Sequence, residues 1–278
     1  MWSEHRFVSF DGTPAYFRRL RTTRLPARGA VMIVHGMGEH SGRYVELAEF
    51  LAEKGFHCYV PDLRGFGKSG GKRGCVRRFT DYFGDLEGVH RMIGEWEDGH
   101  PPFFLGHSFG GLVVSCFLAS KPDVRAKGLV LSSPNFGIAI RVPLWRHALA
   151  VVTSRVYPDL TQPNRVDRMT LTHDLPLLQK HASDRLIHDR ISARLYAELV
   201  SRIRSAGQVA ARLSLPTLIL QAGDDRVVQR AATERFFAAL RSPDKRLEVF
   251  EGLYHELLNE TSRKAIFDQI AAWLLQRA

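Results

Sequence analysis

Ser108 is the first residue in the chain whose surroundings predict chemistry. It lies at the centre of GHSFG (residues 106–110), a G-x-S-x-G pattern. This pattern is typical of a nucleophilic serine when a buried strand precedes it and a helix follows it. An apolar run at 103–105 precedes the serine, and residues 110–120 follow with helical spacing. The pattern therefore predicts a serine hydroxyl held on a tight turn, with the flanking glycines leaving room for strand and helix to approach each other.

A nucleophilic serine needs a base, and the base needs an acidic group that orients it. Asp224 and Asp225 directly follow an apolar strand predicted at 216–223, and His255 follows the next predicted strand. The carboxyl ends of such strands meet at the same edge of a parallel sheet, where Ser108 is also expected. Of the twelve histidines, His255 alone has both the right order in the chain and this position. The spacing predicts His255 as the base and leaves the two aspartates as alternatives for the acid.

The negative charge that develops on an attacked carbonyl oxygen must be stabilised by two N–H donors. One donor is expected from the residue after the nucleophile, Phe109. The other is expected from the glycine loop VHGMGEH (residues 34–40), where Met37 is the favoured donor.

The elements that must position these residues follow from the hydrophobic pattern. A hairpin is predicted over 6–20, and Ser41 is expected to cap the first helix. Continuous apolar runs predict further buried strands, and stripes with a period of three to four residues predict helices. The strands are expected near 30–35, 56–61, 103–105, 128–132, 216–222 and 246–250, and the helices near 41–55, 79–96, 110–120, 231–241 and 263–276. Strands and helices that alternate in this way predict an α/β fold, with a mainly parallel sheet flanked by helices.

One segment interrupts the alternation. Residues 137–206 contain helical patterns and no apolar strand, which predicts an inserted helical cap over a core made of residues 1–136 and 207–278. Trp145, Leu149, Val152 and Val156 form one stripe in this segment. One alternative is that the stripe packs on the core. The other is that part of it faces outward or lines an acyl tunnel, and a basic helix bearing Trp145 is then suited to a lipid surface.

Composition narrows the class of partner and the compartment. The 278 residues carry a net charge of +10, but the arginines are scattered and no nucleic-acid recognition motif accompanies them. The three cysteines, Cys58, Cys75 and Cys116, form no CxxC pair, which favours a reducing compartment. No secretory leader or membrane span is recognised. We therefore expect a cytoplasmic protein with peripheral contact to a membrane, and no nucleic-acid partner.

Several longer motifs carry a resemblance to a known family. VHGMGEHSGRYVELAEFL, PDLRGFGKSGG, GHSFGG, GDDRVV and YHELLNE together resemble the monoacylglycerol lipase and lysophospholipase branch of the α/β-hydrolases. The resemblance covers about residues 6–136 and 207–275. It implies an α/β-hydrolase fold with a helical cap, and a serine ester hydrolase that acts on single-chain glycerolipids without a cofactor or metal.

The matching positions also imply roles for individual residues. They give Ser108 as the nucleophile, Asp225 as the acid and His255 as the base. Asp225 is preferred because the family's acid precedes an x-apolar-apolar step, which Arg226-Val227-Val228 provides. Met37 and Phe109 match the oxyanion-hole donors. The positions implied near the polar end of the substrate pocket are Glu39, Arg43 and His107.

The predicted function is that of a monoacylglycerol lipase that releases a fatty acid and glycerol through an acyl-enzyme. The alternatives are a lysophospholipase, a generalist carboxylesterase or a thioesterase. A more remote alternative is a non-catalytic receptor with the same fold. The expected partner is a small lipid ester, with transient contact between the cap and a membrane surface, and the expected state is a monomer or weak oligomer.

Overall fold

An eight-stranded sheet organises the chain. The computed structural model describes residues 1–140 and 142–278. The strands lie in the order β1-β2-β4-β3-β5-β6-β9-β10. They are β1 (Trp2–Val8), β2 (Pro14–Leu20), β3 (Gly29–Val34), β4 (Phe56–Asp62), β5 (Phe103–His107), β6 (Gly128–Ser132), β9 (Thr217–Ala222) and β10 (Lys245–Phe250). Strands from β4 to β10 run parallel, and the hairpin β1–β2 joins the β4 edge antiparallel. The predicted mainly parallel sheet is therefore confirmed.

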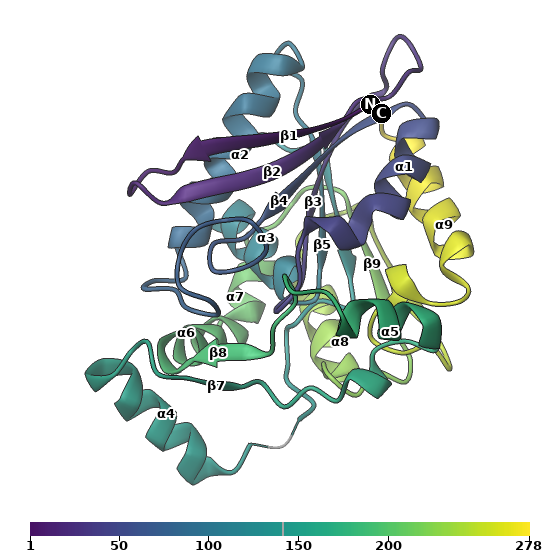
Figure 1. The fold of residues 1–278 in the computed structure, drawn as a ribbon. Helices are drawn as coiled ribbons and strands as arrows, with labels where there is room; N and C mark the ends of the chain where they lie inside the picture. Colours follow the sequence, from purple (N-terminus) through teal and green to yellow (C-terminus); the bar gives the residue numbers. More distant parts are fainter. Residues whose placement is uncertain (141) are drawn as a thin grey trace.

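Helices cover both faces of the sheet (Figure 1). One face carries α1 (Val45–Glu53) and α9 (Arg263–Leu275), and the other carries α2 (Asp81–Trp96), α3 (Phe109–Ser120), α7 (Ala206–Ala210) and α8 (Arg230–Ala239). Every residue of β4, β5, β6 and β9 is buried. A strand buried on both faces needs a continuous apolar run and not an alternating one, which explains the pattern in the sequence.

The entry to the first helix differs from the expectation. Residues Ser41–Tyr44 form a 3-10 turn, η1, before α1 begins. The cap is His40, whose Nδ1 accepts the Gly42 N–H at 3.1 Å, and Ser41 Oγ has no hydrogen-bond partner among the described residues. The prediction that Ser41 caps this helix was wrong. The His40 ring is long enough to reach the orphan N–H and still leave its Nε2 free for another contact.

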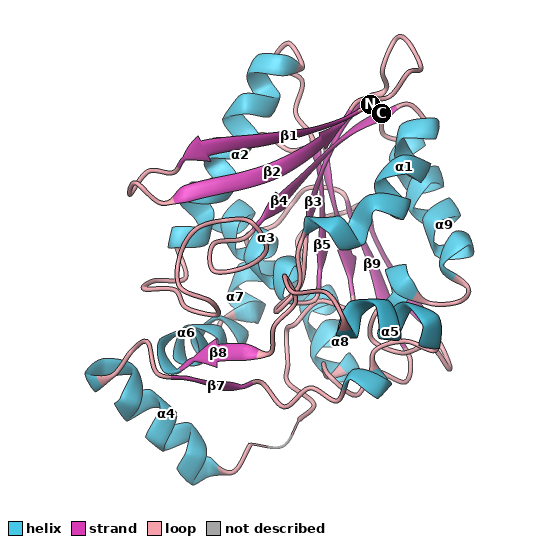
Figure 2. Ribbon diagram, in the orientation of Figure 1, coloured by secondary structure: helices cyan, strands magenta, loops and turns pink. Residues whose placement is uncertain are grey.

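Residues 137–206, which we refer to as the cap segment, follow β6 and lead into α7 and β9. The segment contains α4 (Leu144–Val156), β7 (Thr161–Pro163), the 3-10 turn η2 (Arg168–Thr170), α5 (Leu175–Ala182), β8 (Arg190–Ser192) and α6 (Ala193–Arg204). Figure 2 shows these elements gathered at the carboxyl ends of the parallel strands. The antiparallel pair β7–β8 was not predicted, because strands of three residues are too short to leave a hydrophobic pattern.

Candidate active site

The turn between β5 and α3 holds Ser108 in a conformation that few residues adopt. Its φ is 50° and its ψ is −116°, and the helix α3 begins at the next residue. A positive φ is costly for a residue other than glycine, and such strain is concentrated at functional sites. A Cβ atom at Gly106 would lie 2.6 Å from the Gly111 Cα, and one at Gly110 would lie 2.3 Å from the Val34 carbonyl oxygen. The flanking glycines are therefore required by close packing, as the sequence predicted.

The structure brings Ser108, His255 and Asp225 together in one hydrogen-bonded chain. His255 Nε2 lies 2.8 Å from Ser108 Oγ, and His255 Nδ1 lies 2.8 Å from Asp225 Oδ2. Asp225 and His255 follow β9 and β10, so each group projects from the carboxyl end of a parallel strand. Asp224 is exposed, and it makes no hydrogen bond to His255. The geometry thus distinguishes between the two aspartates that the sequence left open.

The orienting carboxylate is itself fixed by backbone donors. Asp225 Oδ1 accepts the N–H groups of Val227 and Val228, each at 2.9 Å. Burial alone would raise the Asp225 pKa, but the facing His255 and these N–H groups outweigh it and lower the pKa. Burial would lower the pKa of His255, yet the nearby Asp225 carboxylate outweighs it and raises the pKa. Asp225 is therefore ionised at neutral pH and stabilises a positive charge on His255.

The loop after β3 places backbone N–H groups beside the nucleophile. A Cβ atom at Gly36 would lie 3.4 Å from the Ser108 Cβ, which shows how closely the loop approaches the serine. The loop is held by Glu39, whose Oε1 accepts the Gly36 N–H at 2.5 Å. Within the described residues, the N–H groups of Met37 and Phe109 have no hydrogen-bond acceptor. Both donors are thus available for a negatively charged oxygen.

Glu39 and Arg43, which the resemblance placed at the polar end of the pocket, are paired with a third residue. Arg43 Nη1 lies 2.6 Å from Glu39 Oε2, and Arg43 Nη2 lies 2.5 Å from Glu256 Oε2. The exposed fractions of the three side chains are 7%, 4% and 5% for Arg43, Glu39 and Glu256. Burial would raise the pKa of each carboxyl, but the charge of Arg43 outweighs it and lowers both. All three groups remain charged at neutral pH in a buried cluster that also borders the cavity.

His107 lies between this cluster and the triad. Its ring centroid is 5.0 Å from that of His255, and its Nδ1 lies 3.1 Å from the Ser132 carbonyl oxygen. Burial, and then the neighbouring His255, lower the pKa of His107 to about 4. The ring is therefore neutral at pH 7, and its Nδ1–H donates to Ser132. Its Nε2 then remains an acceptor facing the polar end of the site.

The cap segment contacts the glycine loop through polar groups. His40 Nε2 lies 2.9 Å from Asp184 Oδ2, and Arg43 Nη2 lies 2.9 Å from His181 Nδ1. The His188 N–H donates to the Gly38 carbonyl at 3.0 Å. Three residues of the cap segment thus hold the loop that carries Met37 and Glu39.

A cavity of about 670 Å³ extends from Ser108 into the cap segment. Its lining includes many apolar side chains, among them Ile138, Ile140, Trp145, Leu149, Ile191 and Leu199. Trp145, Leu149, Val152 and Val156 are each between 57% and 63% exposed, so the stripe of α4 does not pack on the core. Trp145 and Leu149 line the cavity, while Val152 and Val156 do not. Of the two alternatives for this stripe, the structure supports the outward-facing one.

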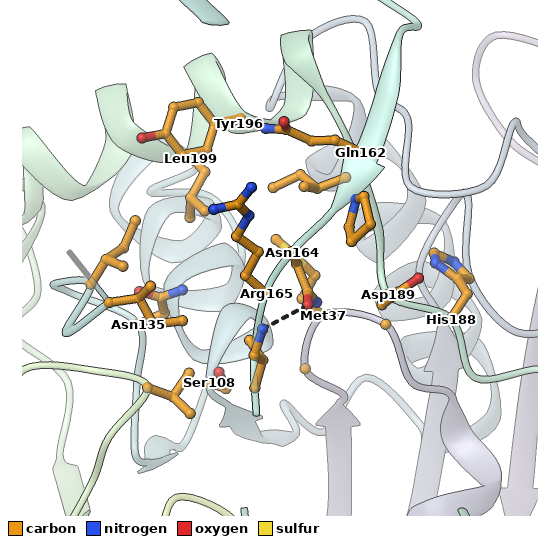
Figure 3. A pocket seen from close by; sticks show the side chains of 18 of the residues that line it. Met37, Ser108, Asn135, Gln162, Asn164, Arg165, His188, Asp189, Tyr196 and Leu199 are labelled. Carbon is orange, nitrogen blue, oxygen red and sulfur yellow. Dashed lines mark hydrogen bonds between the residues drawn. The ribbon is translucent and has the colours of Figure 1, made fainter. Parts of the chain in front are cut away.

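Several polar residues of this cavity were missed by the sequence reasoning. Asn135 is 9% exposed, its N–H donates to the Ser108 carbonyl at 3.0 Å, and its Oδ1 has no partner among the described residues. Figure 3 shows Arg165 pointing into the cavity, with Ser108 and Tyr196 on the same lining. Only the residue next to His255 could have been suspected from its position, because Glu256 is adjacent to the base in the chain. The other residues follow no recognisable spacing.

The described residues include no group of three or more His, Cys, Asp and Glu side chains that could hold a metal ion. None of their helices is both long and apolar enough to cross a membrane.

Comparisons with known proteins agree on one family. Residues 26–262 match the family Hydrolase_4, described as "Serine aminopeptidase, S33". The chain is 31% identical over 249 residues to phospholipase YtpA of Bacillus subtilis, covering 87% of this chain and 93% of that protein. It is 30% identical over 277 residues to a monoacylglycerol lipase of Mycolicibacterium smegmatis, covering 98% and 97%. The crystal structure of a Paleococcus ferrophilus monoacylglycerol lipase superimposes with a TM-score of 0.87 at 33% identity, covering 95% of this chain and 99% of that one.

Proposed function

Because the chain belongs to this Hydrolase_4 family of α/β-hydrolases and is a serine ester hydrolase, we propose that it is a monoacylglycerol lipase that releases a fatty acid and glycerol. The observation that carries the proposal is the hydrogen-bonded chain Ser108–His255–Asp225 beside a large, mostly apolar cavity. The triad supplies ester cleavage, and the cavity supplies room for an acyl chain.

The first half of the proposed reaction makes an acyl-enzyme. Neutral His255 carries its proton on Nδ1, towards Asp225, so that Nε2 accepts the proton of Ser108 Oγ as that oxygen attacks the ester carbonyl. Asp225 keeps the ring in this tautomer and stabilises the imidazolium that forms. The strained turn holds the Ser108 oxygen 2.8 Å from His255 Nε2 before any substrate binds.

The oxyanion is proposed to lie between the N–H groups of Met37 and Phe109. Phe109 is the first residue of α3, so the positive end of that helix adds to the stabilisation. His255 then returns its proton to the leaving alkoxide, and the alcohol departs. In the second half, His255 activates a water molecule, and the fatty acid leaves by the same steps in reverse order.

The polar end of the cavity is proposed to receive the leaving alcohol. His107 Nε2 is an acceptor there, and Glu39 and Arg43 border the same space. Since both charged groups already have partners, we propose that they contribute through their positions and the remaining hydrogen-bonding capacity of Glu39, and not as free ions. This arrangement favours a small uncharged alcohol such as glycerol at this end.

Lysophospholipase activity is the second candidate, supported by the name of the phospholipase relative and by cationic groups in the cavity lining that are described below.

A rate profile over monoacylglycerols, diacylglycerols, lysophospholipids and p-nitrophenyl esters of one chain length tests the proposed monoacylglycerol lipase activity. Monoacylglycerols should be among the substrates with the highest kcat/KM. A preference for p-nitrophenyl or thioester substrates over every glycerolipid would overturn it. Labelling of the wild type, but not of Ser108→Ala, by a fluorophosphonate probe separates an enzyme from a non-catalytic receptor.

We also propose that the protein is cytoplasmic and that residues 137–206 form a cap. In this proposal the cap makes transient contact with a membrane surface. The exposed stripe of α4 supports this, as does its excess of basic residues. Flotation with anionic vesicles tests the contact. Val152→Glu and Val156→Glu should weaken it without altering the cavity lining, whereas Val8→Glu, on the exposed edge strand β1, is the matched control. Equal flotation of all three variants would refute the contact.

The triad, the oxyanion donors and the cavity all come from a single chain. We therefore propose that a monomer is active. Specific activity that does not change on dilution through the range of any self-association would support this proposal.

A further inference from the structure

Arg165 occupies a backbone conformation that is unusual for an arginine. Its φ is 61°, in the left-handed region that glycine adopts freely and that asparagine tolerates best among other residues. The neighbouring residue Asn164 would tolerate this conformation better, yet it is Arg165 that adopts it. Strain of this kind is concentrated at catalytic and ligand-binding sites, which makes Arg165 a candidate for a functional side chain.

The side chain of Arg165 is directed into the cavity that contains Ser108 (Figure 3). Arg168, three residues further along the chain, lines the same cavity. Among the described residues, neither guanidinium has a carboxylate within ion-pair distance, and Asp189, the acidic side chain of the cap segment on the same lining, pairs with neither. Both side chains are exposed to solvent, so the cavity lining includes two accessible cationic groups that no protein carboxylate neutralises.

Arg43 provides the contrast. It borders the same cavity, but its charge is matched by Glu39 and Glu256, and it is almost fully buried. Residues 137–206 as a whole also carry an excess of positive charge, with eleven Lys and Arg residues against six Asp and Glu residues. The unmatched positive charge thus lies on the part of the cavity lining that the cap segment contributes.

We propose that Arg165, assisted by Arg168, forms a subsite for the phosphate group of an anionic single-chain phospholipid, so that lysophospholipids of this class are substrates of the same Ser108 site. A guanidinium binds phosphate through two parallel charge-assisted hydrogen bonds, whereas the uncharged glycerol of a monoacylglycerol offers it no anionic partner. The inference rests on the proposed ester hydrolase function and deepens it, because it names the chemical group that the cap segment recognises.

Two substrates that differ only in a phosphate group test this subsite. 1-Octanoylglycerol and 1-octanoylglycerol 3-phosphate carry the same ester and acyl chain, and both are used below the concentrations at which they aggregate. The measured quantity is the ratio of kcat/KM for the phosphate ester to kcat/KM for the uncharged ester. It is determined for the wild type, Arg165→Asn, Arg168→Asn and Arg185→Asn. Asparagine is chosen at 165 because it accepts the left-handed conformation.

The wild type should hydrolyse the phosphate ester with a kcat/KM at least equal to that for the uncharged ester. Arg165→Asn should lower the ratio about 10- to 100-fold, as expected for the loss of a charge-assisted bond, and Arg168→Asn should lower it less. Arg185→Asn removes the same charge from an exposed site of the cap segment outside the cavity lining, and should leave the ratio unchanged. The ratio of the wild type should also fall at high ionic strength.

Each alternative result has a separate meaning. If the wild type cleaves the uncharged ester but not the phosphate ester, or if Arg165→Asn and Arg185→Asn change the ratio equally, the phosphate subsite is refuted and the proposed function stands. If neither ester is cleaved, the proposed function itself fails. A rise in the melting temperature of Arg165→Asn with an unchanged ratio would assign the strained arginine to the loop alone.

Discussion

Replacement of Arg43 by methionine should destabilise the protein far more than the loss of one surface ion pair would. Glu39 and Glu256 lie on either side of Arg43 with only 4% and 5% of their side chains exposed, so the replacement leaves two buried carboxylates without a counter-charge. Breaking a buried pair in this way typically costs about 3–5 kcal/mol. Against a total stability of about 5–15 kcal/mol, this is a large fraction. Urea denaturation followed by circular dichroism measures it.

The pH dependence identifies the cause of the loss. In the wild type, both glutamate pKa values lie below the ordinary value of 4.5, so their contribution is present at neutral pH and is lost as the pH falls through the folded values. Without Arg43, burial raises both values above those of the unfolded chain. The deficit is then greatest at neutral pH, and it shrinks in acid by about 1.4 kcal/mol per unit of raised pKa.

A second variant separates charge from volume. Arg43→Met combined with Glu256→Met replaces one buried ion pair with apolar side chains, and it should recover at least about 1 kcal/mol relative to Arg43→Met alone. A loss below about 1 kcal/mol for Arg43→Met at pH 7.5, or a loss that is the same at pH 7.5 and pH 4.5, would falsify the reasoning.

Three other predictions concern the triad. Ser108→Ala should abolish ester hydrolysis while shifting the melting temperature by no more than a few degrees, and Ser108→Gly should be more stable than Ser108→Ala because the φ of 50° suits glycine; residual turnover in Ser108→Ala would point to another nucleophile. Asp225→Asn should lower kcat about 10⁴-fold, whereas Asp224→Asn should stay within about threefold, and the reverse order would reassign the acid. The Asp225 carboxylate raises the His255 pKa, and the base must be neutral to act. The value of kcat/KM should therefore fall in acid with an apparent pKa above 6.5, and this apparent pKa should be lower in Asp225→Asn. An apparent pKa below 6.5 in the wild type would contradict the coupling between His255 and Asp225.

The parts of the molecule that could be predicted from sequence are those with local causes. A strand covered on both faces must be apolar along its whole length. Continuous apolar runs in the sequence therefore predicted β4, β5, β6 and β9. Parallel strands end at one edge, so polar residues directly after them had to converge there. These two rules placed Ser108 and His255 close together although 147 residues separate them.

The parts that could not be predicted depend on contacts without a local pattern. Arg43 and Glu256 are 213 residues apart, and nothing in either segment indicates that a buried ion pair joins them. The resemblance marked Arg43 as a residue near the substrate, but it did not reveal the partner that neutralises it. Similarly, a stripe on α4 is equally compatible with a buried face and an exposed one, because periodicity defines a face and not what covers it.

The position of residues 137–206 in the fold has a consequence for how such chains diversify. The segment follows the carboxyl end of β6, and α7 then leads the chain back to the amino end of the adjacent parallel strand β9. The strands that carry Ser108, Asp225 and His255 do not pass through the segment. We therefore propose that the segment can be exchanged as one piece between relatives and that substrate selectivity would move with it. A working chimera must preserve the contacts of Asp184 and His188 with the glycine loop, and that of His181 with Arg43 in the adjoining η1 turn. Any transplanted segment must therefore supply equivalent partners for Arg43, His40 and the Gly38 carbonyl.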